Sequence, residues 1–270
     1  MTYLIIDLHA SKASMLQCIS VIAPTPVFAA LMCTHALEKK LDDRLGIRGV
    51  GLIHKNYQPW IDSVENSKGY LEHNLIQRRG AYQFDPVRPK KGEPLSTPLQ
   101  PNALADYHWS LLLDCEHNIS PELLMEIKYT MQTMRFAGGV ISKVQVKSTD
   151  DWDTALKMSK PGFWIDDVSE RLMLQDSPFV SLIDACQTGS WVMPSTLGYA
   201  CLTMPTERVG ARDAKDHAFV EHMLGLVQFS SMGKRMATLT PDQLWRYGWD
   251  ADQFLVTNRV SAVLSVTPTF

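Results

Sequence analysis

No apolar run in the sequence approaches the roughly 20 residues that a membrane-spanning helix needs. The first ten residues hold Asp7 inside their apolar stretch and carry no basic leader, which argues against a signal peptide. The five cysteines are odd in number, widely spaced and without a CxxC pair, so neither a disulfide framework nor a zinc ribbon is indicated. We therefore expect a reduced, cytoplasmic chain with no membrane partner.

A strong excess of charge of either sign is also missing. Lys and Arg total 26 against 29 Asp and Glu, the formal net charge is −3 and the pI is about 6.2. With 45% hydrophobic residues, this composition excludes a disordered polyelectrolyte, and 270 residues suffice for one large or two small domains. A nucleic-acid contact would have to come from a local basic patch rather than from the field of the whole protein.

Sequence signatures of common enzymes do not occur: GxGxxG, GxSxG, HExxH and the phosphate loop GxxxxGK followed by Ser or Thr are all missing. The acidic runs at 150–153 and 166–167 do not resemble an EF-hand loop, and a solvated surface is the preferred interpretation. For His35 and His54, a place in the core or at an interface is favoured over catalysis. We expect no metal and no cofactor.

The first half of the chain shows a regular alternation of strand and helix patterns. Strands are predicted at 3–8, 50–54, 107–115 and 140–146, and helices at 27–45 and 121–136, the first ended by Gly46 and the second capped by Ser120. This order predicts an α+β, ferredoxin-like (RNA-recognition-motif-type) βαββαβ domain over 1–147. A long insertion at about 60–102, rich in proline, interrupts it.

The second half, 148–270, has less regular α/β patterns and is predicted to be an extension packed on the first. A helix is expected at 177–186, and two short strands bent at Pro194 and Gly198 are expected within 191–203. Apolar residues at helical spacing, among them Phe219, Met223 and Val227, predict a helix over 216–236. Thr240 is expected to cap a further short helix.

The insertion carries the most informative composition in the chain. Five cations and two aromatic residues stand close together in it: Arg78, Arg79, Arg88, Lys90 and Lys91 with Tyr82 and Phe84. Cations neutralise phosphates and planar rings stack on unpaired bases, which is what a single strand of nucleic acid requires. A solvated loop that is merely basic is an equally good interpretation of the composition alone.

Several short stretches, in the same order and context, resemble one family. They are Thr34–Lys40, Gly49–His54, Met134–Ile141, Trp191–Pro194 with Gly198-Tyr199, and Ala211–Asp213 followed by Phe219–Glu221 and Gly225-Leu226. On these stretches the chain is similar, from about residue 3 to 250, to the Csy-two family, the Cas-five-type subunit of type I-F CRISPR surveillance complexes. The chain is shorter than is usual for the family between Val146 and Trp191.

The resemblance implies a non-catalytic RNA-binding subunit that takes part in antiviral defence. Such a subunit holds the 5′ handle of the CRISPR RNA, caps one end of the complex, and contacts the backbone subunit and, where the system has one, the large subunit. It also lies near the motif that flanks the target double-stranded DNA. The insertion would be the family's long thumb, whose cations and aromatic rings would bind the handle.

Two further groups of residues are expected at the handle by the same resemblance. Arg135, beside Gly138 and Gly139 at the end of the second predicted helix, would meet RNA backbone where glycines allow a close approach; the alternative is that Arg135 interacts with the dipole at the helix end. Ser11 and Lys12, after the first strand, could also reach the RNA.

Two other functions stay open at this point. One is a metal-independent endoribonuclease that processes precursor RNA, for which His73 with Tyr70 or Lys68 would be the candidates; cleavage of repeat RNA in EDTA would reveal it. The other is a protein scaffold that docks through the Met-rich segment 216–236.

Overall fold

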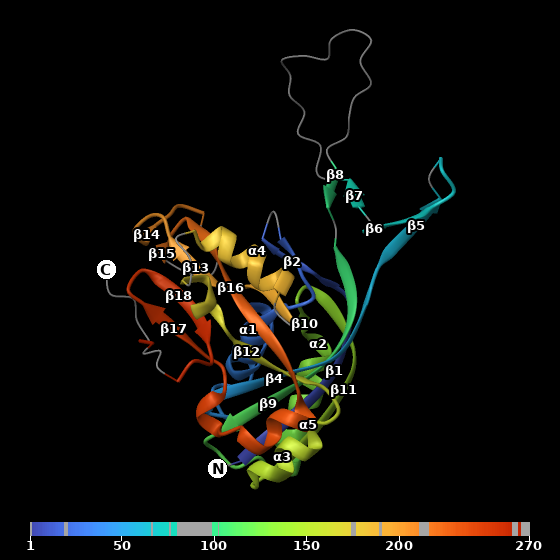
Figure 1. Cartoon of the computed structure of the whole chain (residues 1–270). Coiled ribbons are helices and arrows are strands. Elements are labelled where there is room, and N and C mark those ends of the chain that lie inside the picture. Colours follow the sequence, from blue (N-terminus) through green and yellow to red (C-terminus); the bar gives the residue numbers. More distant parts are fainter. Residues whose placement is uncertain are drawn as a thin grey trace.

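The computed structural model describes residues 2–18, 21–65, 67–75, 77–79, 99–101, 103–173, 177–188, 191–210, 216–260 and 264–265. Its centre is one ten-stranded sheet in which every neighbouring pair of strands is antiparallel (Figure 1). The strand order is β10 (Arg135–Phe136), β11 (Gly139–Thr149), β1 (Thr2–Ser14), β9 (Leu104–Cys115), β4 (Ile47–Pro59), β12 (Phe163–Asp167), β16 (Val220–Ser231), β13 (Val192–Cys201), β18 (Gln253–Thr257) and β17 (Arg246–Asp250).

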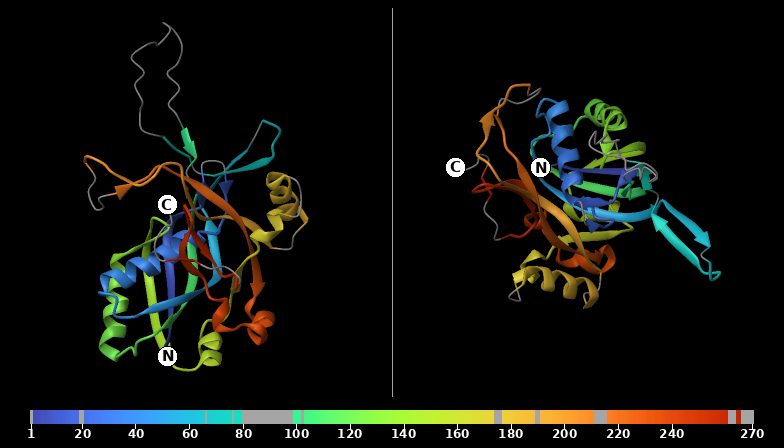
Figure 2. Two further views of the ribbon diagram at one scale, coloured as in Figure 1. Left: turned by 90° about the vertical axis from the view of Figure 1, so that its left-hand side faces the viewer. Right: turned by 90° about the horizontal axis from the view of Figure 1, so that it is seen from above.

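Helices cover parts of both faces of this sheet (Figure 2). One face carries α1 (Val27–Lys40) and α2 (Pro121–Thr133), and the other carries α3 (Trp152–Met158) and α5 (Met232–Arg235). Alternation along β1 explains the two layers, since Leu4, Ile6 and Leu8 belong to the core beneath α1 and α2. Tyr3 and Ile5 point the other way and pack with residues of α3 and α5.

Smaller elements complete the described chain. They are α4 (Pro178–Thr188), the 3-10 helices η1 (Ser169–Met173), η2 (Met236–Thr238) and η3 (Pro241–Gln243), and four two-stranded ladders: β2 (Leu16–Cys18) with β3 (Val21–Ile22), β5 (Ile61–Glu65) with β6 (Leu71–Leu75), β7 (Gln77–Arg79) with β8 (Leu99–Pro101), and β14 (Thr206–Glu207) with β15 (Asp216–His217). The ladders β5–β6 and β7–β8 project beyond one end of the large sheet (Figure 1). Among the described residues, no helix has the length and apolar character needed to cross a membrane.

The predicted fold class is wrong. The structure is dominated by a single large antiparallel sheet and is not a ferredoxin-like βαββαβ α+β domain with a less regular α/β part beside it. The cause is the pairing of β12 with β4, in which Phe163 lies opposite His54 and Trp164 opposite Ile53. Strands from residues 148–270 thereby continue the sheet that the first half begins, instead of leaving β4 as an unpaired edge.

The predicted helix over 216–236 is also wrong, because most of this segment is the strand β16. β16 pairs with β12 on one side and β13 on the other, and Gly225 to Val227 at its middle are buried. A strand buried on both faces has a continuous apolar run that cannot be distinguished from a buried helix by periodicity. Gly225 fits the strand, since an added Cβ would lie 2.4 Å from Leu197 Cδ1 and from Ser169 Oγ.

Other predicted elements occur with shifted ends. The helix at 27–45 ends at Lys40, because Asp42 and Asp43 have positive φ angles of 53° and 57°. The cap of α2 is confirmed, since Ser120 Oγ accepts a hydrogen bond from the Leu123 N–H at 3.2 Å. Instead of two short strands, 191–203 contains the single strand β13 with a register shift between Thr196 and Gly198.

Candidate nucleic-acid interface

The turn between β10 and β11 brings three predicted contact residues together. Arg135 lies on β10, opposite Val140 of β11, and not at the end of α2, which stops at Thr133. In the described part of the structure, the Arg135 side chain donates to the Gly138 carbonyl oxygen and not to a carbonyl of α2, which does not support the alternative interaction with the helix end. Gly138 in the turn is exposed and has a φ of 79°, a conformation that favours glycine.

Gly139 packs against the end of β1, where no side chain would fit. A Cβ at Gly139 would lie 2.6 Å from the Ser11 carbonyl oxygen and 2.7 Å from Ala13 Cβ. The Ser14 N–H also donates to the Ala137 carbonyl oxygen at 2.9 Å. The glycine thus allows the turn to approach the segment that holds Ser11 and Lys12, although the two segments are more than a hundred residues apart in the chain.

Ser11 and Lys12 form a bulge between β1 and β9. Ala10 pairs with Tyr107 and Ala13 with Ala105, so the two residues between them face only Asp106. Lys12 has a φ of 56°, and its N–H donates to Asp106 Oδ1 at 2.9 Å. The bulge directs the Lys12 ammonium over the ring of Trp60, 5.0 Å from the ring centroid.

Trp60 stands where the predicted insertion leaves the sheet. Its N–H donates to the Leu104 carbonyl oxygen at 2.8 Å, which closes the base of the insertion. Arg78 and Arg79 lie farther out on β7, opposite Gln100 and Leu99 of β8. The other predicted contacts of the insertion lie outside the described residues: Tyr82, Phe84, Arg88, Lys90 and Lys91.

The Arg135 side chain is exposed beside a groove of about 490 Å³ between α1 and the β10–β11 turn. Phe28, Met32 and Ala36 of α1 give the groove an apolar wall, and Lys40 and Arg135 bring positive charge to it. Arg135 Nη1 donates to the Gly138 carbonyl oxygen at 3.3 Å, and a guanidinium has further N–H groups that can bind phosphate. Apolar wall and cations together suit a segment of single-stranded RNA.

A second polar cluster, which sequence analysis missed, lies on the sheet face opposite α1 and α2. Asp7 is at its centre: Oδ1 lies 2.8 Å from His108 Nε2, while Oδ2 accepts from Ser110 Oγ at 2.9 Å and lies 2.5 Å from Lys55 Nζ. The His9 ring stacks on the His108 ring with centroids 3.9 Å apart. We call Asp7, His9 and His108 the Asp–His–His cluster.

The electrostatics of this cluster follow from partial burial and close charges. Burial raises the pKa of Asp7, but hydrogen bonds from Lys55, His108 and Ser110 outweigh it, so the pKa lies below its ordinary value. Burial, followed by repulsion from His108, lowers the pKa of His9. Asp7 is therefore ionised and His9 neutral at pH 7.

Cross-strand register explains why these side chains meet. Asp7 lies opposite Ser110, and His9 lies opposite His108, on the face that alternation turns away from α1 and α2. Opposite His9 on the other side, Lys143 of β11 is exposed. The signal available in the sequence was polar residues two apart, Asp7 with His9 and His108 with Ser110, inside two apolar strands.

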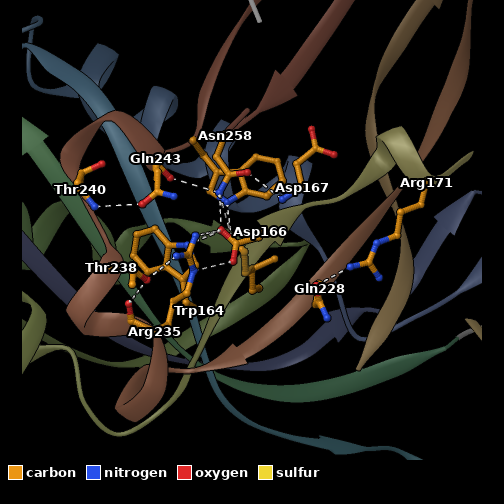
Figure 3. A network of polar contacts seen from close by, with 12 residues as sticks. Trp164, Asp166, Asp167, Arg171, Gln228, Arg235, Thr238, Thr240, Gln243 and Asn258 are labelled. Atoms are coloured by element: carbon orange, nitrogen blue, oxygen red, sulfur yellow. Dashed lines mark hydrogen bonds and ion pairs between the residues drawn. The ribbon is translucent and has the colours of Figure 1, made fainter. Parts of the chain in front are cut away.

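Two of the acidic residues that were expected to be a solvated surface, Asp166 and Asp167, are partners in the fold (Figure 3). Asp166 forms an ion pair with Arg235 at 3.2 Å and accepts from Trp164 Nε1 at 3.0 Å. Asp167 is buried and pairs with Arg259 at 3.1 Å. The solvated-surface prediction is wrong for these two, because their carboxylates connect β12 to the segments after β16 and β18.

The candidates for an endoribonuclease lie on the β5–β6 hairpin. Lys68 is in the turn, Tyr70 is exposed, and His73 of β6 pairs with Ser63 of β5. The His73 side chain lies outside the described part of the structure. The core position predicted for His54 is confirmed, since 8% of its surface is exposed, and His35 Nδ1 lies 2.7 Å from the Tyr247 hydroxyl.

Comparison of the chain with models of protein families and with curated proteins found no match in either set.

Proposed function

We propose that this chain is a non-catalytic RNA-binding subunit of a type I-F CRISPR surveillance complex and holds the 5′ handle of the CRISPR RNA. Two observations support the proposal. One is the resemblance of five stretches of sequence to the Csy-two family. The other is the contact between the β1 bulge and the β10–β11 turn, both of which carry residues expected at the handle.

The contact between the β10–β11 turn, which carries Arg135, and the β1 bulge, which carries Lys12, is the observation that carries the proposal. Lys12 and Arg135 come from β1 and β10, which lie on either side of β11 at one end of the sheet, and both side chains are exposed. Gly139 allows this close approach, and Trp60 joins Lys12 to the base of the insertion. Cations, an aromatic ring and an apolar groove within one region are the components that single-stranded RNA needs.

Partner proteins enter the proposal through the resemblance alone. The chain would cap one end of the assembly against the backbone subunit, meet a large subunit in systems that have one, and lie near the flanking motif of the target double-stranded DNA. A near-neutral net charge of −3 suits a subunit that shares its RNA with more basic neighbours.

The proposal is tested by neutralising one cation on each of these two segments. In the complex assembled with its neighbouring subunits, Lys12→Ala with Arg135→Ala should weaken RNA retention and reduce the salt dependence of binding. Each lost phosphate contact lowers the slope of log affinity against log salt by about 0.7 for a single strand, so the double variant should lose about 1.4.

The matched control is Lys128→Ala, which removes an exposed cation of α2. This variant should leave both retention and slope unchanged. An unchanged slope in the double variant, with the complex intact, would remove the support that the contact between these segments gives to RNA binding.

A further inference from the structure

The Asp–His–His cluster holds three metal-ligating atoms close together beside the β1 bulge, and His9 and His108 line a pocket that also includes Ser11. One carboxylate oxygen of Asp7 and one ring nitrogen each of His9 and His108 lie within 4.8 Å of one another. Two donors bound to one ion at ordinary Zn²⁺ distances are roughly 3.4 Å apart in a tetrahedral site. Small side-chain rotations therefore suffice to bring all three onto one ion.

The surroundings leave the correct atoms available. Lys55 and Ser110 both hold Oδ2 of Asp7, so Oδ1 is the oxygen directed at the histidines. Oδ1 lies 2.8 Å from His108 Nε2, and an ion bound by both atoms would replace the proton between them. The hydrogen bonds to Oδ2 would orient the carboxylate, as second-shell partners do for a metal ligand. Within the described residues, the His9 ring has a stacking contact with His108 and no hydrogen bond, so its nitrogens are available to an ion.

The chemistry of the cluster favours a cation over the alternatives. The Asp7 carboxylate would repel a phosphate, and this repulsion would persist in any arrangement of the histidine rings. The stacked rings, 3.9 Å apart, leave no room between them for a scissile phosphate, as acid–base cleavage by two histidines would require. Two imidazoles and a carboxylate are instead the donors of Zn²⁺ and neighbouring transition metals.

We propose that Asp7, His9 and His108 bind a divalent transition metal ion such as Zn²⁺ on the open face of the sheet. The side chains of Asp7 and His108 keep 22% and 30% of their surface exposed, so the ion would remain in contact with solvent. Its remaining coordination positions would be filled by water or by an oxygen of a bound ligand. Mg²⁺ and Ca²⁺ prefer all-oxygen ligands and should bind poorly.

The test is titration of the full chain, without a polyhistidine tag and without RNA, with Zn²⁺ and with Co²⁺. We expect one ion per chain, a rise in thermal stability with Zn²⁺, and visible absorption bands of Co²⁺ bound by nitrogen and oxygen. His9→Ala and His108→Ala should each weaken Zn²⁺ binding at least about tenfold, since loss of a second-shell partner alone typically costs that much.

His222→Ala is the matched control, because it removes an exposed histidine outside the cluster and should leave Zn²⁺ affinity unchanged. Thermal unfolding of each variant without metal shows that it is folded. Absence of stoichiometric binding by the folded wild-type chain, or binding that survives both cluster substitutions, overturns the inference. The RNA proposal is unaffected by either result, since this titration contains no RNA and does not use Lys12 or Arg135.

Discussion

His54 illustrates how a single buried group makes the stability of the fold depend on pH. Its ring packs edge-on against Trp109 and Phe229, and its Nδ1 is buried without a hydrogen-bond partner among the described residues. Burial, with a smaller contribution from repulsion by His108, lowers the pKa of His54 to about 4. The native state therefore excludes a proton that the unfolded chain binds near its ordinary pKa of about 6.5.

We predict that the free energy of unfolding falls as the pH falls from about 6.5 to 4, because protons bind the unfolded state preferentially in this window. The contribution of His54 is present in full above pH 6.5, and about 3 kcal/mol is lost by pH 4. In His54→Leu the loss should be smaller by this amount, as measured by urea unfolding at a series of pH values. His222→Leu is the control and should follow the wild type; equal pH dependence of wild type and His54→Leu would contradict the assignment.

The sequence alone could indicate some of the site residues and not others. Arg135, Gly138 and Gly139 form a compact local motif, so their proximity was expected from the chain itself. The Asp–His–His cluster joins residues about a hundred positions apart through the register of β1 against β9. Register depends on which bulges form, and no local pattern in a single sequence specifies it.

At the scale of elements, the β10–β11 turn offers two neighbouring glycines with different requirements. Gly139 needs space, since an added Cβ would lie within 2.7 Å of β1, whereas Gly138 needs its positive φ and has nothing within 4 Å of an added Cβ. The first is a packing constraint that holds the turn against Ser11. The second is a conformational constraint on the turn alone.

We predict that Gly139→Val lowers the free energy of unfolding by about 1–3 kcal/mol, moves the turn away from the β1 bulge and reduces RNA retention. Gly138→Ala should cost about 1–2 kcal/mol through backbone strain and retain RNA. Urea unfolding and RNA content of the purified complex measure both effects. A fully assembled, RNA-loaded complex from Gly139→Val would show that this contact does not shape the RNA path.

Sequence patterns predicted the N-terminal strands but not the strand β16. β1 and β9 each have one face in the main core. Their other face joins a smaller core at Tyr3, Ile5 and Leu112 and is polar at Asp7 and His108. The N-terminal strands were predicted near their observed positions. β16 is buried on both faces at its centre. Val220 and Val227 are β-branched and suit a strand, even though the spacing of Phe219, Met223 and Val227 imitates a helix. Its partners, β12 and β13, decide the outcome, and those contacts are not local.

For the whole molecule, the pairing of β12 with β4 is the step that the sequence could not predict. The order of elements in residues 1–147 contains no indication that later strands would extend the sheet. Trp164 of β12 packs at this junction, where its ring is fully buried against Gly51 of β4. A side chain at Gly51 would not fit, since an added Cβ would lie 2.7 Å from the Trp164 ring. The residues near the proposed RNA interface thus stand at one end of a continuous sheet.

The net charge of the chain and the location of its cations also bear on function. The chain as a whole is slightly acidic. Lys12 and Arg135 lie on two segments that are in contact, and Arg78 and Arg79 lie on β7, which projects beyond the large sheet. Binding by such a chain alone should be weak and strongly dependent on salt. Handle recognition should therefore be measured in the assembled complex.

The most direct measurement is to express the chain with its neighbouring subunits and a matching CRISPR array, and to purify the complex through a tag on this chain. The bound RNA would be sequenced, and ultraviolet crosslinks would be assigned to peptides. We predict crosslinks from the 5′ handle to peptides that contain residues 11–12, 135–139 and 68–91. A complex that carries CRISPR RNA but shows no crosslink to this chain would contradict RNA binding and favour a protein scaffold.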